Sequence, residues 1–143
     1  MNLTLPPSVN GKVSPRRILE TVLYADDLAA AHQFYTEVLG LEVLSYNPER
    51  SIFFKVGSGM LIVFRAEKTL IPDAGVPTHG TTGPGHMAFG ASRDEIDEWR
   101  DQLIRHGIEI EMEKSWSSGA FSIYFRDPAG NSLEFATPDL WFS

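Results

Sequence analysis

Residues 122–135 read SIYFRDPAGNSLEF, in which two mostly apolar segments flank a tight turn. Pro128 fixes φ at one turn position and Gly130 tolerates a positive φ at another, so the flanking segments are predicted to pair as antiparallel strands. In the second strand, Glu134 lies between two apolar residues, and the alternation of side chains puts it on the opposite face from both. A carboxylate in the middle of an apolar strand needs a partner that stabilises its charge.

A weaker copy of the same design occurs in the first half of the chain. Residues 52–64 contain two apolar segments joined by a glycine-rich turn at residues 57–59. When the two halves are aligned by their turns, Val63 corresponds to Glu134, and each half is predicted to form a strand, a helix and three further strands. The chain is therefore predicted to be an α+β protein built from two tandem βαβββ modules.

Turn residues and a proline-rich connection give the predicted boundaries. The chain divides into a flexible lead-in at 1–15, a first module at 16–66, a linker at 67–85, a second module at 86–138 and an apolar tail at 139–143. The linker contains three prolines and four glycines, and a connection of that length typically crosses between modules or covers a site. The tail includes the sequence LWF, so we expect it to dock onto the core of the chain or onto a partner subunit.

Each module is predicted to contain one amphipathic helix. A carboxylate at residues 26–27 is positioned to cap the first helix, which is expected to end at Gly40. Ser92 is the predicted cap of the second helix, which is expected to end at residues 106–107. The apolar stripe of the second helix is expected to consist of Ile96, Trp99, Leu103 and Ile104.

The composition argues against several classes of protein. With 143 residues, 43% of them hydrophobic, the chain has the length and composition of one soluble domain or of two small modules that share a sheet. The absence of cysteine excludes disulfides and thiolate metal ligands, and a net charge of −7 argues against a nucleic-acid partner. No stretch approaches the ~20 apolar residues of a membrane span, and residues 1–7 lack the features of a secretion signal, so we expect no membrane association and a cytoplasmic location.

Two segments carry a resemblance to a known family: GHMAF at residues 85–89, which opens the second module, and YFRDPAGNSLE at residues 124–134, which closes it. Together with the paired modules, they resemble the vicinal oxygen chelate superfamily. This superfamily includes glyoxalase I, fosfomycin-resistance transferases, methylmalonyl-CoA epimerase, extradiol dioxygenases and metal-free bleomycin-binding proteins. The resemblance extends over residues 17–138 and implies a curved mixed sheet with a cup-shaped site.

The resemblance also implies a metal site. In metal-dependent members, the ligands lie on the first and last strands of each module, and those positions here are Glu20, Val63, His86 and Glu134. Because valine cannot bind a metal, the predicted ligands of a divalent cation are Glu20, His86 and Glu134. One imidazole and two carboxylates suit Mn²⁺, Fe²⁺, Ni²⁺, Zn²⁺ or Mg²⁺, and three protein ligands leave positions for two vicinal oxygens of a substrate.

The two carboxylates are also the predicted catalytic residues. Glu20 occupies a position more often held by His or Gln in the superfamily, and three roles stay open for it: a third ligand, a displaceable ligand that accepts a proton, or a solvated side chain on an edge strand. For Glu134, either a cation or an arginine across the sheet can offset the cost of burying the charge. For His86, the small neighbour Ala88 on the same face favours a ligand over an ordinary polar residue.

The predicted substrate-binding residues lie on the loop at residues 114–119 and on the strand that follows it. This segment is similar to the one that holds a phosphonate and a monovalent cation in fosfomycin-resistance proteins. The predicted residues are Lys114, Trp116, Ser118, Ser122, Tyr124 and Arg126. Trp116 is expected either to line the mouth of the cup or to cap the core, and an ordinary loop would equally explain Ser118. Glu20 in place of His and Val22 in place of a hydroxyl residue argue against fosfomycin as the substrate.

Few other residues point to a site. By alternation, Tyr24 shares a face with Glu20 and Phe53 shares one with Lys55, so these faces are candidates to line the cup, although a core position is favoured for Phe53. Arg50 and Arg65 are expected either to contact an anion or to be solvated at strand ends. The other three histidines are expected to be structural or exposed, although the linker can carry His79 over the cup.

Two functions follow from the resemblance. The first is a glyoxalase-like metalloenzyme that binds vicinal oxygens of a small substrate and acts as a lyase, isomerase or transferase. An extradiol dioxygenase is less expected, because the two-histidine, one-carboxylate ligand set of non-haem iron oxygenases is not reproduced. The second function is metal-free binding or sequestration of a small molecule, as in the bleomycin-resistance members. Under both, the resemblance implies a homodimer, and in a swapped arrangement Glu20 of one subunit meets His86 and Glu134 of the other.

Overall fold

The structure is a computed structural model that describes residues 13–72 and 75–142. The predicted lead-in at 1–15 therefore lies outside the described residues except for its last three. The elements of the first half are β1 (Glu20–Tyr24), α1 (Leu28–Gln33), the π-helix η2 (Phe34–Val38), β2 (Glu42–Asn47), β3 (Ser51–Val56), β4 (Gly59–Phe64) and the short helix α2 (Ala66–Thr69). Those of the second half are β5 (His86–Gly90), α3 (Arg93–Arg105), β6 (Met112–Ser115), β7 (Phe121–Arg126), β8 (Ser132–Ala136) and the 3₁₀ helix η3 (Pro138–Leu140). The predicted α+β class and paired βαβββ order are confirmed.

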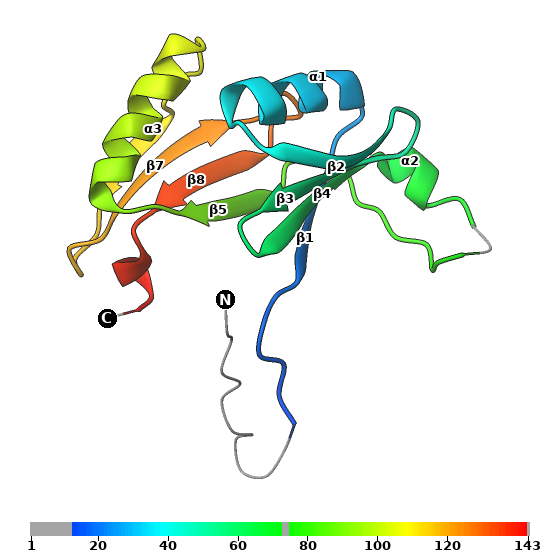
Figure 1. Ribbon diagram of the computed structural model, residues 1–143, viewed down its shortest axis with the longest axis horizontal. Helices are drawn as coiled ribbons and strands as arrows, with labels where there is room; N and C mark the ends of the chain where they lie inside the picture. Colours follow the sequence, from blue (N-terminus) through cyan, green and yellow to red (C-terminus); the bar gives the residue numbers. More distant parts are fainter. Residues whose placement is uncertain (1–12, 73–74, 143) are drawn as a thin grey trace.

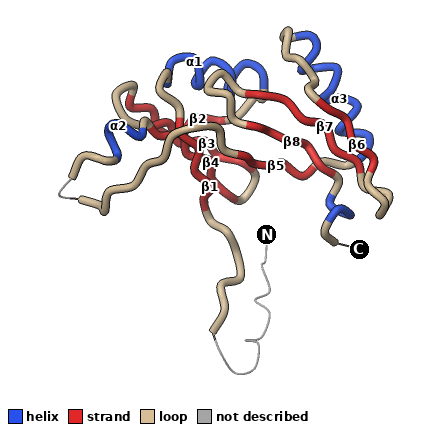
Figure 2. The backbone as a smooth tube through the Cα atoms, turned by 180° about the vertical axis from the view of Figure 1, so that it is seen from behind, coloured by secondary structure: helices blue, strands red, loops and turns tan. Residues whose placement is uncertain are grey.

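The strands form two mixed sheets of identical topology. Each has four strands, in the orders β1-β4-β3-β2 and β5-β8-β7-β6. In each sheet the first strand of the module runs parallel to the last, and the other neighbours are antiparallel. Figures 1 and 2 show the two sheets next to each other, and β1, β4 and β5 together line a groove where the sheets meet. The single mixed sheet that was predicted is therefore present as two four-stranded sheets with the same topology.

A layer of helices covers one side of the sheets. Figure 1 shows α1 and α3 on this side, and buried residues from both modules form a single apolar cluster there. The largest fully buried members include Tyr35, Phe54, Phe125, Ile96 and Leu133. Because side chains alternate between the two faces of a strand, the residues between these core positions lie on the opposite faces, which the helical layer leaves uncovered.

The helix caps occur where the sequence predicts them. Asp27 accepts a hydrogen bond from a backbone N–H in the first turn of α1, and Ser92 forms a capping box with Glu95 at the start of α3. Gly107 adopts a positive φ of 72° just after α3. Two details differ from the expectation: the last turn of the first helix is a π-helix, and Ile104 is exposed instead of buried. None of the described helices has the length and apolar character of a membrane span.

The DPAGN turn between β7 and β8 ties the two modules together. The Tyr35 hydroxyl donates to Asp127 Oδ2 (2.7 Å), and Asn131 Nδ2 donates to the same oxygen (2.9 Å). Asn131 also donates to the backbone oxygen of Tyr24 (3.2 Å) and accepts the backbone N–H of Gly85 (2.7 Å). Burial, together with the Asp127 carboxylate, raises the pKa of Tyr35, so its hydroxyl stays protonated. The turn that predicts the hairpin thus also joins residues that are 92 positions apart.

Two aromatic residues of the predicted tail do not pack on the core of their own chain. The side chains of Trp141 and Phe142 are 79% and 74% exposed, and Ser143 lies outside the described residues. The expectation that the tail docks onto its own core is wrong for these two residues. Docking onto a partner subunit stays a prediction, because two adjacent exposed aromatic side chains form a surface that burial would stabilise.

Candidate functional site

The candidate site lies on the two sheet faces that point away from the helices. We call these faces the first and second half-cups. The first half-cup consists of Glu20, Val22, Tyr24, Ser51, Phe53, Lys55, Met60, Ile62 and Phe64. The second consists of His86, Ala88, Gly90, Ser122, Tyr124, Arg126, Ser132, Glu134 and Ala136, together with Lys114 on β6. Each residue of the first half-cup has a counterpart in the second, because the registers of β1, β3 and β4 repeat in β5, β7 and β8.

The strand register corrects one correspondence expected from the sequence. Ile62 pairs with the third residue of β1, as Glu134 pairs with the third residue of β5. The counterpart of Glu134 is therefore Ile62 and not Val63, which is fully buried in the core. The alignment by turns fails by one residue because the β7–β8 turn is longer than the β3–β4 turn. Both candidates are apolar, so the first half-cup has no metal-binding side chain at this position.

The second half-cup places a histidine and a glutamate in contact. His86 Nε2 lies 3.2 Å from Glu134 Oε1, between the parallel strands β5 and β8. The Glu134 side chain is only 6% exposed, whereas that of His86 is 52% exposed and so can be reached from solvent. The other carboxylate oxygen, Glu134 Oε2, is buried and has no hydrogen-bond partner among the described residues. A buried carboxylate oxygen of this kind costs free energy unless a cation or a donor meets it.

A backbone hydrogen bond sets the orientation of the His86 ring. His86 Nδ1 lies 3.0 Å from the carbonyl oxygen of Ser132, which can only accept, so Nδ1 carries a hydrogen. A neutral His86 then directs its Nε2 lone pair toward Glu134 Oε1, and two acceptors face each other. Either a proton on Nε2 or a cation near both groups relieves this contact. Because metal-ligating histidines commonly donate their other ring N–H to a carbonyl, the donor set of the second half-cup fits a divalent cation.

Tyr124 is a neutral hydrogen-bond donor beside this pair. It pairs with Glu134 across β7 and β8, and its ring lies nearly parallel to that of His86, with centroids 6.4 Å apart. Burial, followed by the Glu134 carboxylate, raises the pKa of Tyr124, so the phenol keeps its proton at neutral pH. The structure therefore brings three of the predicted site residues together.

The predicted residues on β6, on the loop that follows it and near the start of β7 form a second group. Ser122 is fully buried, and its Oγ accepts a hydrogen bond from Trp116 Nε1 (3.0 Å). Lys114 pairs with Ser122 across β6 and β7, and its Nζ lies 4.8 Å from the centre of the Trp116 ring. Ser118 lies in the turn, where its Oγ accepts the backbone N–H of Ala120 (3.4 Å), a contact that an ordinary turn explains.

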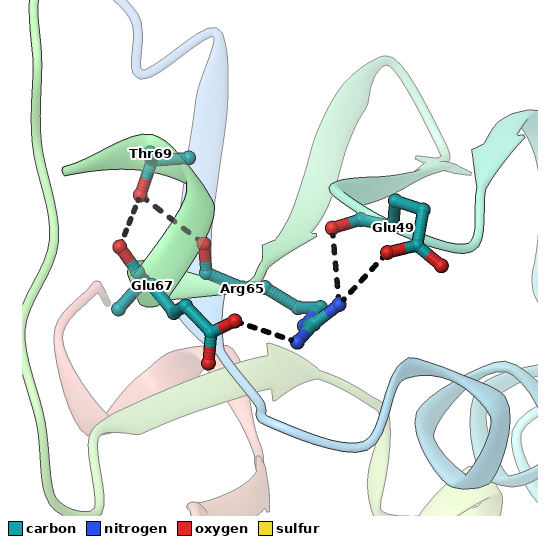
Figure 3. Close-up of polar contacts among 5 residues, drawn as sticks. Glu49, Arg65, Glu67 and Thr69 are labelled. Carbon is teal, nitrogen blue, oxygen red and sulfur yellow. Dashed lines mark hydrogen bonds and ion pairs between the residues drawn. The ribbon is translucent and has the colours of Figure 1, made fainter. Parts of the chain in front are cut away.

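Two arginines expected near the site are held by carboxylates. Arg126 Nε and Nη2 donate to the two carboxylate oxygens of Glu111, at 2.9 and 3.1 Å. Arg65 Nη2 lies 3.1 Å from Glu67 Oε1, and its Nη1 lies 3.5 Å from Glu49 Oε2 (Figure 3). These carboxylates balance both guanidinium charges, so binding of substrate by Arg126 stays a prediction that requires breaking its ion pair.

The first half-cup is mostly apolar and lines a cavity of about 800 Å³. Its apolar lining residues on the strands are Val22, Phe53, Met60, Ile62 and Phe64. The expectation that Phe53 is a core residue is wrong, since Phe53 lines this cavity and Phe54 occupies the fully buried position. Glu20 lies in the same cavity, at the beginning of β1.

A histidine of the linker completes the first half-cup. His79 Nδ1 lies 2.6 Å from the Tyr24 hydroxyl, and its ring meets that of Phe64 edge-on, with centroids 4.8 Å apart. The backbone N–H of His79 donates to the carbonyl oxygen of Thr69 (3.1 Å), which anchors this part of the linker beside α2. The length of the linker is the only sequence signal for this placement, because no local pattern sets the path of the segment.

The three predicted metal ligands are not assembled within one chain. His86 and Glu134 contact each other in the second half-cup, whereas Glu20 is exposed and lines the first. Across residues 13–72 and 75–142, no three His, Asp or Glu side chains lie close enough together to hold a metal ion. Within the described chain, Glu20 therefore lies in a different half-cup from His86 and Glu134.

The repeated topology and its concave, helix-free faces define the chain as a paired βαβββ protein. The model of the Glyoxalase/Bleomycin resistance protein/Dioxygenase superfamily matches residues 17–135, and the chain belongs to this superfamily. The crystal structure of lactoylglutathione lyase from Agrobacterium tumefaciens is similar, with a TM-score of 0.87 and 42% identity, over 90% of this chain and 98% of that chain.

Two further relatives carry different activities in their names. Biphenyl-2,3-diol 1,2-dioxygenase 3 from Rhodococcus globerulus is 32% identical over 136 residues, which make up 89% of this chain and 68% of the relative. Metallothiol transferase FosB from Lysinibacillus sphaericus is 31% identical over 115 residues, which make up 80% of this chain and 77% of the relative. The superfamily is thus common to a lyase, a dioxygenase and a transferase.

Proposed function

We propose that this chain is a glyoxalase-like metalloenzyme that uses a divalent cation to bind two vicinal oxygens of a small substrate. The observation that carries the proposal is the buried Glu134 carboxylate. Its Oε2 has no partner among the described residues, and its Oε1 faces Nε2 of His86. His86 and Glu134 hold the cation, and Glu20 of the partner subunit supplies the third ligand in a homodimer. When bound, the cation acts as a Lewis acid on the substrate oxygens.

The chain's own side chains supply the other functions of the site. Tyr124 keeps its proton at neutral pH and can donate a hydrogen bond to a substrate oxygen next to Glu134. Glu20, which is exposed, is the carboxylate that can exchange a proton with the substrate. Lys114, close to the Trp116 ring, offers a positive charge to an anionic group at the outer end of the second half-cup.

The relatives support a lyase, isomerase or transferase reaction. The solved structure with 42% identity is that of a lactoylglutathione lyase, and the transferase relative bears a metal in its name. The dioxygenase relative acts on a compound named as a 2,3-diol, which has two adjacent oxygens. Two adjacent oxygens of this kind are the groups that the proposed metal site of this chain would chelate.

The experiment that tests the proposal is metal retention. Purified protein is incubated with Mn²⁺, Fe²⁺, Ni²⁺ and Zn²⁺, dialysed exhaustively and analysed by mass spectrometry for metal. The expected result is about one ion per chain, abolished by Glu134→Ala and by His86→Ala, as for a site whose ligands are removed. Glu98→Ala, which removes an exposed carboxylate on α3, is the matched control and retains the ion. Wild-type protein without metal, or full retention by Glu134→Ala, overturns the proposal.

A second function, metal-free binding of a small molecule, is favoured by one specific observation. If His86 is doubly protonated, its contact with Glu134 at 3.2 Å is an ion pair that needs no metal. The apolar cavity of the first half-cup would then be the main binding surface. Tight binding of an aromatic compound to protein shown to be free of metal supports this alternative.

A further inference from the structure

The cavity of the first half-cup has polar groups at both ends and an apolar middle. Glu20 and Tyr24 are the first and last residues of β1, and a rise of ~3.3 Å per residue puts their Cα atoms about 13 Å apart. Between them lies the row formed by Val22, Ile62 and Phe53, which are paired across β1, β4 and β3. All five residues line the cavity. A ligand that fills it therefore meets polar, apolar and polar surfaces in that order.

The Tyr24–His79 pair offers a hydrogen-bond donor at its end of the cavity. The phenol oxygen and His79 Nδ1 are 2.6 Å apart, and one hydrogen lies between them. If Tyr24 donates, the neutral imidazole carries its hydrogen on Nε2; if His79 donates, the phenol hydrogen is free. One donor therefore remains in either tautomer. Burial raises the pKa of Tyr24, so the phenol is protonated at neutral pH. The complementary ligand group is an oxygen that accepts.

Two contacts besides the Tyr24 hydrogen bond hold His79 in place. The His79 ring packs edge-on against Phe64, and its backbone N–H is bonded to the carbonyl oxygen of Thr69. Thr69 is itself buried, and its Oγ1 lies 3.4 Å from the carbonyl oxygen of Arg65. Linker residues 75–79 line the cavity along with this pair. A polar pair positioned in this way at the edge of an apolar cavity is typical of a ligand-orienting group.

We infer that the first half-cup binds the ring-bearing body of the substrate and that Tyr24 and His79 bind an oxygen acceptor at its far end. The substrate class is an elongated compound with two vicinal oxygens at one end, an apolar ring in the middle and a carboxylate, carbonyl or hydroxyl oxygen at the other. The position of the vicinal oxygens near Glu20 rests on the proposed function, whereas the ring and the acceptor rest on the first half-cup alone.

Two probes that differ only at the far end test the inference. 3-(3,4-Dihydroxyphenyl)propanoate has vicinal oxygens, a ring and a carboxylate, and 4-ethylcatechol is the same compound without the carboxylate. By isothermal titration calorimetry, we expect the first to bind about tenfold more tightly, the gain typical of one hydrogen bond to a charged acceptor. The double substitution Tyr24→Phe/His79→Leu removes both donors, so it is expected to abolish this tenfold ratio while changing the affinity for 4-ethylcatechol less than twofold. Phe53→Ala is expected to weaken both probes by about tenfold through loss of ring contact.

The controls separate this inference from the proposed function. Ile104→Ala, an exposed apolar residue on α3, leaves both affinities unchanged. Circular dichroism confirms folding, and Phe53→Leu replaces Phe53→Ala if the latter does not fold. A ratio that survives the double substitution Tyr24→Phe/His79→Leu, affinities that survive Phe53→Ala, or no binding of either probe overturns the inference. Retained metal without the ratio contradicts the inference alone, whereas the ratio in protein that retains no metal contradicts only the proposed metalloenzyme.

Discussion

The two half-cups have the same strand order and register, and opposite chemistry. In the second, Glu134 and Tyr124 face each other across β7 and β8. In the first, the corresponding positions are Ile62 and Phe53, also paired across neighbouring strands. One sheet therefore presents a buried charge with polar neighbours, and the other presents aromatic and aliphatic surface around a cavity.

This difference shows that the two faces of each sheet are constrained separately: one face must be apolar to form the core, whereas the cup face need not be. The faces that meet α1 and α3 are apolar in both sheets, because they form one continuous core. The opposite faces are free to differ, since no helix of that layer covers them (Figure 1). A duplicated fold can thus have one half-cup that holds a charge and another that contacts an apolar group. A site formed by both half-cups combines the two properties.

Removing the buried carboxylate of the second half-cup has the largest expected effect. Glu134→Ala gives this face an apolar residue at the position that Ile62 occupies in the first, and we expect metal affinity to fall by at least about 1,000-fold, or ~4 kcal/mol, because a primary ligand is lost. Competition with a chromophoric chelator measures the affinity. Glu98→Ala on the exposed face of α3 serves as the control, and an affinity within tenfold of wild type would show that Glu134 is not a ligand.

Introducing a charge into the first half-cup sharpens the comparison. Ile62→Glu copies Glu134 onto the equivalent position, where Ile62 is buried among apolar residues. We expect a loss of about 3 kcal/mol in the free energy of unfolding, because the new carboxylate has no adjacent histidine. Urea denaturation measures it, with Ser58→Glu in the exposed β3–β4 turn as the control. Unchanged stability would mean that the first half-cup tolerates charge as the second does.

Loosening the contact between the modules has a smaller effect. Asp127→Asn places an amide where the carboxylate accepts from both Tyr35 and Asn131, so one hydrogen bond is lost and two donors oppose each other. The expected cost is about 2 kcal/mol in the free energy of unfolding, as for a buried hydrogen bond left unsatisfied. Asp26→Asn, at an exposed position, should cost nothing measurable. Equal effects of the two substitutions would show that the DPAGN turn does not stabilise the module contact.

The same contact predicts a dependence of stability on alkaline pH. The folded state raises the pKa of Tyr35 above its ordinary value of 10.0, so the contribution of its neutral form is complete below that pH. Above it the unfolded chain releases the proton first, and stability falls by up to about 1.4 kcal/mol per pH unit from this group. Tyr35→Phe should therefore show a shallower fall in the urea midpoint between pH 10 and 11. Identical slopes in the two proteins would contradict the assignment.

The sequence was sufficient to predict the order of the helices and strands. It was insufficient to predict which residues of the two half-cups correspond to each other and where His79 lies. Turn and cap residues such as Gly130 and Ser92 act locally, so the hairpin and the start of α3 could be predicted from them. The counterpart of Glu134 was misplaced by one residue, because the two hairpin turns differ in length. Since side chains alternate between the two faces of a strand, an error of one residue moves the predicted counterpart from the cup face to the core face. His79 could not be placed, since its position depends on packing against Phe64 and on a hydrogen bond to the hydroxyl of Tyr24.

The predicted metal ligands show the same limit. His86 and Glu134 could be paired from the sequence, because parallel first and last strands of one module bring them together. Glu20 was predicted at the same metal but lies in the other half-cup of the same chain. A sequence pattern cannot tell whether two modules of one chain or of two chains face each other, because the modules share one topology and either pairing brings a first half-cup to a second.

The most direct test of a site shared between unlike half-cups is complementation between two defective chains. Glu20→Ala and Glu134→Ala protomers carry different affinity tags, are coexpressed, and are purified through both tags so that only mixed dimers remain. Each variant alone is expected to retain no metal after dialysis. The mixed dimer contains one intact pair of half-cups, so we expect about one ion per dimer, against about two for wild type. No metal in the mixed dimer, or full retention by Glu20→Ala alone, would contradict a site formed by Glu20 of one protomer with His86 and Glu134 of its partner.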